Sequence, residues 1–291
     1  MAFQYPSQRL QDWLSQLWVM ARGRRVEPSE IPWLFGPFGD VDVIADRYIK
    51  RLAEEESLEI DRGEGCGLFD SMTEMLGDRA ADLNPRVRDF YERTSDHTLE
   101  VWSEWCAAFR PFAALIQRLY SRRLQQLNLP LRPLDTARGM TSEILKLRDP
   151  ATGKARYTVW YRRLKGTGQV LYSGVYGCTV LADGRRCAKI IFPLPRGNAT
   201  VVMEARVDED GSLELISSGR QFGDPGFYFL LRDARGRHYA QFIRSFRERI
   251  RVYVDAENTT RADHALTLWG FTALRLHYKI TRRVAEPAAA P

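Results

Sequence analysis

The stretch KIIFPLPRGNATVVMEARVDEDGSLELISSGRQFGDPGF, residues 189–227, decides the fold class of this chain. Apolar and polar residues alternate along it, and glycines or an Asp-Gly pair interrupt the alternation at short intervals. Alternation with a period of two is typical of strands with one buried face, and Asp-Gly between two such runs is a strong hairpin signal. The stretch predicts consecutive antiparallel strands, which raises the question of what those strands enclose.

The alternation extends from about residue 137 to residue 280. The turn signals between the strand-like runs include Asp149-Pro150, Gly166 with Gly168, Asp183-Gly184 and Asp210-Gly211. About eight to ten antiparallel strands in series usually close or curl, because closure removes unpaired edges. We predict an α+β chain in which residues 136–284 form an antiparallel meander, a lipocalin-like closed or partly closed barrel. A helix-grip fold is the alternative, less favoured because no long helix follows the last strands.

The first part of the chain has a helical period instead. Apolar residues recur at helical spacing in residues 10–18 and 112–124, and Asn84-Pro85 is a helix-start signal. We therefore predict a mainly helical region over residues 1–135. Within it, HTLEVWSEW (97–105) alternates well enough to be a strand.

Two shorter segments also carry predictions. Asp224-Pro225 predicts the start of one short helix, GFYFLLRD (226–233), inside the β region. The Ala/Pro-rich residues 285–291 predict a disordered tail.

The composition excludes several classes of protein. With 291 residues, 44% of them apolar and 27% charged, the chain is typical of a globular protein. No window reaches the roughly 20 apolar residues of a transmembrane helix. The first apolar run, residues 14–21, precedes its arginines, which is the reverse of the order in a signal peptide. We expect a soluble, cytoplasmic protein without a transmembrane segment.

The net charge of +6 does not by itself indicate a nucleic-acid partner. Of the 43 basic residues, 37 are Arg and 6 are Lys, a ratio that a GC-rich genome produces through its codons. Basic and acidic residues also interleave over most of the chain, which is typical of a solvated surface. Nucleic acid is therefore not an expected partner.

The sequence contains no pattern that specifies a metal or a cofactor. Its four cysteines form no CxxC pair and no Cys/His zinc spacing, and its four histidines are scattered. Dinucleotide-binding, phosphate-binding and hydrolase motifs are also missing. We predict no metal and no cofactor.

Alternation sorts two long segments into faces. In residues 238–254, the mostly apolar face carries Arg244 and Glu248, and in residues 264–280 it carries His264 and Tyr278. A buried polar group needs a partner, so these four side chains are expected to meet one another, water or a ligand. A few orienting polar groups in an apolar interior are typical of a ligand pocket.

The Asp183-Gly184 hairpin adds two candidates. If these residues form the turn, Cys178 pairs with Lys189, and Tyr176 shares their face. A partly buried lysine can have a lowered pKa and act as an amine nucleophile or base. The candidate ligand-binding residues are Arg244, Glu248, His264, Tyr278, Lys189 and Tyr176, and the candidate general bases are Glu248 and His264.

These residues also have structural interpretations. Arg244 and Glu248 could form a buried ion pair, His264 and Tyr278 could be satisfied core residues, and Lys189 could point outward. The sequence therefore leaves three functions open. The barrel binds an apolar small molecule, or it catalyses isomerisation, cyclisation or hydrolysis of such a ligand, or it has a solid interior and its exposed tryptophans bind a protein partner.

Two runs in the β region resemble a known family. VDEDGSLELISSGRQF and RADHALTLWGFTALRLHYKI look like the C-terminal soluble region of YndJ-type bacterial proteins, and LNPRVRDFY is similar to the segment that opens that region. The resemblance covers about residues 85–280, and this chain lacks the family's membrane portion. It implies a bacterial protein, and because the family has no established activity, it implies no site residues.

Overall fold

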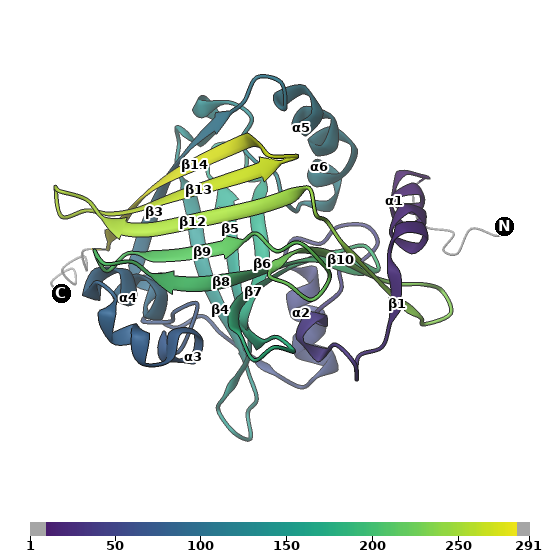
Figure 1. Cartoon of the computed structure of the whole chain (residues 1–291), viewed down its shortest axis with the longest axis horizontal. Coiled ribbons are helices and arrows are strands. Elements are labelled where there is room, and N and C mark those ends of the chain that lie inside the picture. The colour runs from purple at the N-terminus through teal and green to yellow at the C-terminus, as the bar shows by residue number, and fades with distance from the viewer. Residues whose placement is uncertain (1–9, 284–291) are drawn as a thin grey trace, which may run out of the picture.

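The computed structural model describes residues 10–283, and its main element is an antiparallel sheet of 14 strands (Figure 1). The predicted tail over residues 285–291 lies outside the described residues. The strands of the central meander are β4 (Met140–Arg148), β5 (Ala155–Leu164), β6 (Val170–Val180), β7 (Arg186–Leu194), β8 (Gly197–Val207), β9 (Leu213–Ser217), β12 (Phe246–Val254), β13 (Thr260–Leu268) and β14 (Phe271–Arg282).

Two strands from the N-terminal part of the chain extend the meander at its edges. β2 (Glu59–Asp61) pairs with β4, and β3 (His97–Trp105) pairs with β14, so the order is β2-β4-β5-β6-β7-β8-β9-β12-β13-β14-β3. The predicted antiparallel meander is thus confirmed. Backbone hydrogen bonds do not close the curled sheet. Across the open seam, the Arg283 side chain donates a hydrogen bond to the Ser142 backbone oxygen at 3.3 Å.

The sheet forks at β8. The second half of β8 pairs with β9, whereas its first half, residues 197–202, pairs with β10 (Gly226–Arg232). β10 continues into β11 (His238–Phe242), which pairs with β1 (Arg24–Val26). The close approach at the fork requires Gly197, because a Cβ there would lie 2.1 Å from the Leu230 backbone oxygen.

The helix predicted after Asp224-Pro225 is wrong, because this segment forms β10. The Asp224 carboxylate accepts hydrogen bonds from the backbone N–H groups of Arg220 and Gln221, so it closes the preceding loop and does not cap a helix. Along β10, Phe227 contacts one hydrophobic cluster and the buried Tyr228 belongs to another. Bulky aromatic residues on alternate faces favour a strand.

The helices come from the N-terminal region, which also supplies β1, β2 and β3. They are α1 (Leu10–Arg22), α2 (Arg47–Glu55), α3 (Thr73–Leu76), α4 (Pro85–Glu92), α5 (Arg110–Ile116) and α6 (Arg122–Leu124), with one π-helical turn, Gln117–Ser121, between α5 and α6. Asn84 caps α4 by accepting a hydrogen bond from the Arg86 N–H at 3.0 Å. HTLEVWSEW is β3, and its side chains alternate between buried and exposed.

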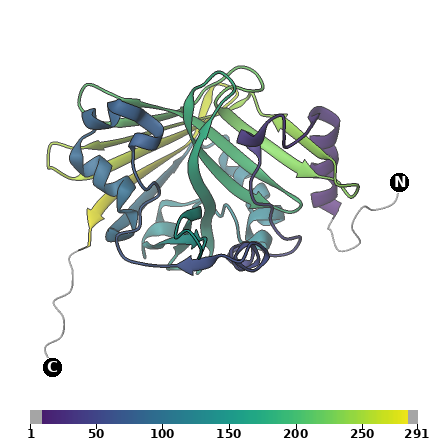
Figure 2. The ribbon, with the colours of Figure 1, turned by 90° about the horizontal axis from the view of Figure 1, so that it is seen from below.

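Three hydrophobic clusters position these elements. The largest fills part of the sheet interior, and α3 and α4 contribute Met75, Val87 and Phe90 to it. A second cluster packs α2 against the outer face of β4 to β7, and a third packs residues 31–38 against β8, β10 and β11. Figure 2 shows α3 and α4 at one end of the molecule, with α1 at the other.

Two segments that the sequence suggested as single strands each contain a turn. Residues 238–254 break into β11 and β12 at a turn closed by the hydrogen bond from the Phe246 N–H to the Ile243 oxygen at 3.2 Å. Residues 264–280 break at Trp269-Gly270, the turn between β13 and β14. A register shift next to Leu266 restores the alternation, so His264 and Tyr278 still share the interior face.

Candidate ligand-binding site

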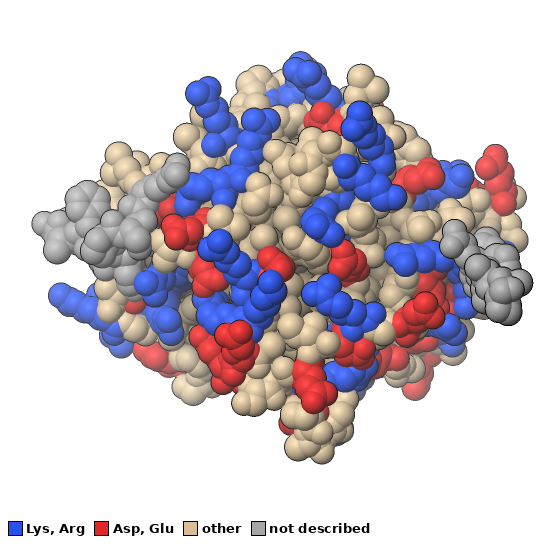
Figure 3. All heavy atoms as spheres, turned by 180° about the vertical axis from the view of Figure 1, so that it is seen from behind, with Lys and Arg blue, Asp and Glu red and all other residues tan. Residues whose placement is uncertain are grey.

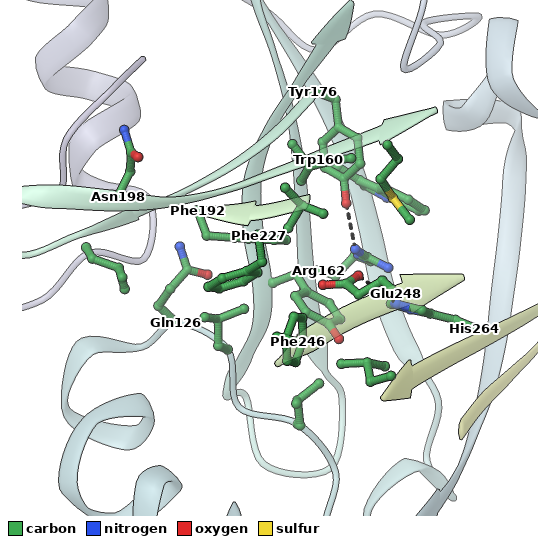
Figure 4. Close-up of a pocket in the computed structure, with 18 of the residues that line it drawn as sticks. Gln126, Trp160, Arg162, Tyr176, Phe192, Asn198, Phe227, Phe246, Glu248 and His264 are labelled. Carbon is green, nitrogen blue, oxygen red and sulfur yellow. Dashed lines mark hydrogen bonds and ion pairs between the residues drawn. The ribbon is translucent and has the colours of Figure 1, made fainter. Parts of the chain in front are cut away.

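A cavity of about 550 Å³ lies inside the curled sheet. Its walls are mainly aromatic and aliphatic side chains, such as Phe192, Phe227 and Phe246 (Figure 4). The lining continues outward to Trp18 of α1 and Ile116 of α5, both of which are partly exposed to solvent. The cavity is therefore bounded at one end, the closed end, by Phe90 and Tyr91 of α4, and it reaches the surface between α1 and α5.

Arg162 of β5 is a buried cation in this cavity, with 5% of its surface exposed. Its guanidinium carbon lies 3.7 Å from the centre of the Trp160 ring and 4.4 Å from that of the Tyr172 ring. Its Nη2 donates a hydrogen bond to the Tyr176 hydroxyl at 3.0 Å. Its buried Nε has no hydrogen-bond partner among residues 10–283. A buried N–H donor without an acceptor is costly, so the protein leaves this guanidinium incompletely satisfied.

Glu248 of β12 and His264 of β13 form a second polar group. Glu248 Oε2 lies 2.9 Å from His264 Nε2, and the two side chains are only 10% and 12% exposed. The backbone N–H of Glu248 donates to Ser217 Oγ at 2.8 Å, which fixes the strand at this point. Figure 4 shows Glu248 between His264 and Arg162.

Tyrosine hydroxyls complete the polar part of the cavity. Burial raises the pKa of Tyr278 to about 12, against the opposing effect of the Arg162 cation. Burial also raises the pKa of Tyr176, and it raises that of Tyr172 well above the ordinary value. These three phenols therefore stay neutral near pH 7 and act as hydrogen-bonding groups.

The structure brings four of the six sequence candidates together: Tyr176, Glu248, His264 and Tyr278 all line the cavity. The sequence analysis missed Arg162. The available signal was the alternation of YTVWYRRL, which places Arg162 on the same face as Trp160 and Leu164.

Arg244 does not reach the cavity, so its predicted interior position is wrong. It lies exposed in the turn between β11 and β12, where its Nε donates to the Arg220 backbone oxygen at 3.0 Å. The turn interrupts the alternation on which the prediction depended. Residues on the two sides of the turn belong to different branches of the forked sheet.

Lys189 also lies elsewhere, because the predicted hairpin register is off by one residue. The loop is longer than Asp183-Gly184, so Gly177 pairs with Lys189 and Cys178 pairs with Ala188. Lys189 therefore points to the outer face, where its Nζ donates to the Phe35 backbone oxygen at 2.6 Å. Burial lowers its pKa to about 8.

Near the mouth, two buried amides shape the wall. Gln126 donates to the Ser173 backbone oxygen at 2.8 Å and accepts from the Ser173 N–H at 2.9 Å. Asn198 donates to the Pro37 oxygen at 3.3 Å. These amides are occupied by backbone groups and act as structural supports.

Within residues 10–283, no group of His, Cys, Asp and Glu side chains is arranged to hold a metal ion.

Comparisons with protein-family models, with curated proteins and with solved structures gave no match for this chain. The resemblance to YndJ-type proteins consequently stays a prediction from the sequence. Among the described residues, no helix has the length and apolar character needed to cross a lipid bilayer.

Proposed function

We propose that this protein binds one apolar small molecule inside the curled sheet, in the manner of a lipocalin-like barrel. The observation that carries the proposal is the cavity of about 550 Å³ with Arg162 buried in its wall. The volume falls within the roughly 300–1,000 Å³ of small-molecule pockets. A barrel of about eight strands has an interior wide enough for one small ligand.

The polar groups indicate the chemistry of the ligand. Arg162 is an incompletely satisfied cation in the cavity wall, and guanidinium groups bind carboxylates with paired hydrogen bonds. The rest of the wall is largely apolar, so the other part of the ligand is an apolar chain or ring system. We therefore propose an apolar molecule that carries a carboxylate, oriented with this group toward Arg162 and the neighbouring tyrosines.

A pair of adjacent arginines gives a matched test. Arg162 faces the cavity, whereas the neighbouring Arg163 faces outward, with a side chain 44% exposed and paired with Glu143 at 3.1 Å. We expect Arg162→Met to weaken binding of a fluorescent long-chain carboxylic acid about tenfold or more, a change of about 1.4 kcal/mol. Arg163→Met should leave it unchanged.

Two further measurements complete this test. A fluorescent long-chain alcohol should bind the wild type and Arg162→Met with similar affinity, because it carries no anion. Urea unfolding should show that both variants fold. Equal binding of the acid by wild type and Arg162→Met would contradict the proposed role of Arg162.

Native mass spectrometry followed by organic extraction of the purified protein then identifies a retained ligand.

The Glu248–His264 pair favours a second candidate function, catalysis on the bound molecule. A carboxylate 2.9 Å from an imidazole inside a cavity can accept or deliver a proton, as isomerisation, cyclisation or hydrolysis requires. The test is to incubate the extracted compound with wild type and with Glu248→Gln, and to follow its mass and retention time. Conversion by the wild type alone would support catalysis, and equal conversion would remove Glu248 from the mechanism.

The cavity argues against the third function, a partner-binding module with a solid interior. Such a partner surface would consist of some of the tryptophans Trp13, Trp18, Trp33, Trp102 and Trp105. Trp18 and Trp102 are 43% and 45% exposed, but Trp33 is 8% exposed and packs in the core. The tryptophans therefore do not form one exposed surface.

A further inference from the structure

Apolar side chains are exposed around the mouth of the cavity. They belong to two helical segments, α1 and residues 112–119, and each is between 37% and 60% exposed. We name this surface the apolar rim, and its members are Leu10, Leu14, Leu17, Trp18, Phe112, Leu115, Ile116 and Leu119. A soluble surface rarely gathers so many large apolar side chains without a binding function.

The two halves of the apolar rim are held side by side. Gln11 donates to the Leu119 backbone oxygen at 3.0 Å, and the Tyr120 hydroxyl donates to the Gln11 backbone oxygen at 3.0 Å. Asp12 and Arg123 form a buried ion pair beneath them. The rim is therefore one fixed surface.

The apolar rim is continuous with the cavity. Trp18 and Ile116 belong to both, since each lines the cavity and is partly exposed to solvent. The Trp18 ring also packs edge-on against Phe229 of β10, with 6.0 Å between ring centres. An apolar path thus leads from the surface to the interior.

Basic residues lie beside the α5 half of the apolar rim, and acidic residues are scarce there. Residues 105–134 contain no Asp or Glu. The exposed Arg110, Arg118 and Arg122 of this segment form no ion pair within the part of the chain that the structure describes. Figure 3 shows basic side chains over α5 and α6, at the upper left of that view, where acidic side chains are sparse. The electrostatic complement of this surface is an anionic one.

We propose that the apolar rim docks on the surface of an anionic lipid bilayer, and that the cavity exchanges its ligand directly with the membrane. The inference rests on the proposed function, because it concerns the route by which an apolar ligand enters. Amphipathic helices with leucine and aromatic residues on one face and arginine beside them bind in the headgroup region of bilayers. Each exposed arginine adds attraction to anionic lipids.

The docked position matches the chemistry of the cavity. An apolar carboxylic acid partitions into bilayers with its carboxylate at the surface. With the mouth against the bilayer, the ligand passes along Trp18 and Ile116 without crossing bulk water, and its carboxylate reaches Arg162. A protein partner would need acidic groups to complement the same arginines, but it would not supply the ligand.

The experiment is flotation of the full chain with vesicles of phosphatidylcholine alone or mixed with phosphatidylglycerol. We expect binding to the mixed vesicles that weakens as salt is added. Leu14→Glu with Leu115→Glu should reduce vesicle binding roughly tenfold or more, because two leucines no longer enter the interface. Neither residue lines the cavity. Val180→Glu is the matched control, since Val180 is 56% exposed on the β6–β7 hairpin.

A second pair of variants tests the charge. Arg118→Glu should weaken binding to the mixed vesicles, whereas Lys154→Glu, exposed on the β4–β5 turn, should not. Equal vesicle binding by the wild type and by the Leu14→Glu/Leu115→Glu variant would overturn the proposal. A wild type that is dimeric, with a Leu14→Glu/Leu115→Glu variant that is monomeric, would also overturn the proposal, because the rim would then bind a second copy of the chain.

Ligand binding in solution separates this proposal from the proposed function. The Leu14→Glu/Leu115→Glu variant should bind the fluorescent acid in vesicle-free buffer with wild-type affinity. A wild type that binds the acid but not the vesicles would overturn only the membrane docking. A wild type that binds the vesicles but not the acid would overturn the proposed function and, with it, ligand exchange.

Discussion

Short helices cover both ends of the curled sheet, but the two ends use their apolar residues in opposite ways. At the closed end, Met75 of α3 and Phe90 of α4 are 4% and 3% exposed and belong to the main core. At the open end, Leu14 of α1 and Leu115 of α5 are 51% and 52% exposed. Only the open end adjoins the cavity mouth.

The apolar content of a helix alone does not decide whether the helix packs in the core or stays exposed. Both ends have helices with several large apolar residues, and at the closed end these residues meet strands across the interior. At the open end, the same kinds of residue surround an entrance and are exposed to solvent. The apolar rim is therefore a local feature of one end and does not reflect loose packing of the whole molecule.

The largest effect is expected at the closed end. Phe90→Ala should lower the free energy of unfolding by about 3–5 kcal/mol, the usual loss for a buried phenylalanine. Its ring lies 5.1 Å from Tyr91 and 5.6 Å from His97, measured between ring centres, so several contacts disappear together. Urea unfolding followed by tryptophan fluorescence measures the loss. A loss below about 1 kcal/mol would contradict the view that this end is closely packed.

An intermediate effect is expected on the outer face, where residues 31–38 cover β7. Burial lowers the pKa of Lys189 to about 8, whereas an unfolded lysine titrates near about 10.4. Between these values the unfolded chain binds more protons, so stability rises with pH. From pH 8 to about 9.5, the free energy of unfolding of the wild type should rise by roughly 1–2 kcal/mol relative to that of Lys189→Met. The same comparison with Lys154→Met, at an exposed site, should show no such gain.

The smallest effect is expected at the open end. Leu115→Ser should change the free energy of unfolding by less than about 0.5 kcal/mol, because an exposed side chain has little packing to lose. The same urea unfolding measures it. A loss similar to that of Phe90→Ala would show that the rim is part of the core, and the comparison between the two ends would fail.

The sequence predicted the meander because alternation and turn signals are local properties of the chain. It also placed Glu248, His264 and Tyr278 in the interior. For His264 and Tyr278 this success depended on a feature that alternation does not show. The Trp269-Gly270 turn alone would have put one of them outside, and the register shift beside Leu266 brings both back inside.

The failures have physical causes that act beyond neighbouring residues. Arg244 lies in a turn that contains neither glycine nor proline, so no local signal marks it. Lys189 lies on the opposite face from the predicted one, because a shift of one residue in the hairpin register moves every side chain of the strand to the other face. Arg162 shares the face of Trp160 and Leu164 by alternation, and only the pairing of β5 with β6, which sets Arg162 opposite Tyr172, shows that this face is the interior. The cavity is lined by residues of β5 to β10 and β12 to β14, so no single segment encodes it.

The pairing of β3 with β14 has a consequence for how the chain folds. Glu104 of β3 and Arg275 of β14 are partners separated by 171 residues. Non-local pairings form slowly, because a long loop must close before they yield any contacts. During synthesis, β3 emerges early and keeps an unpaired edge until β14 has left the ribosome. HTLEVWSEW, with its alternating apolar residues, is therefore exposed to aggregation in the nascent chain until its partner strand is available.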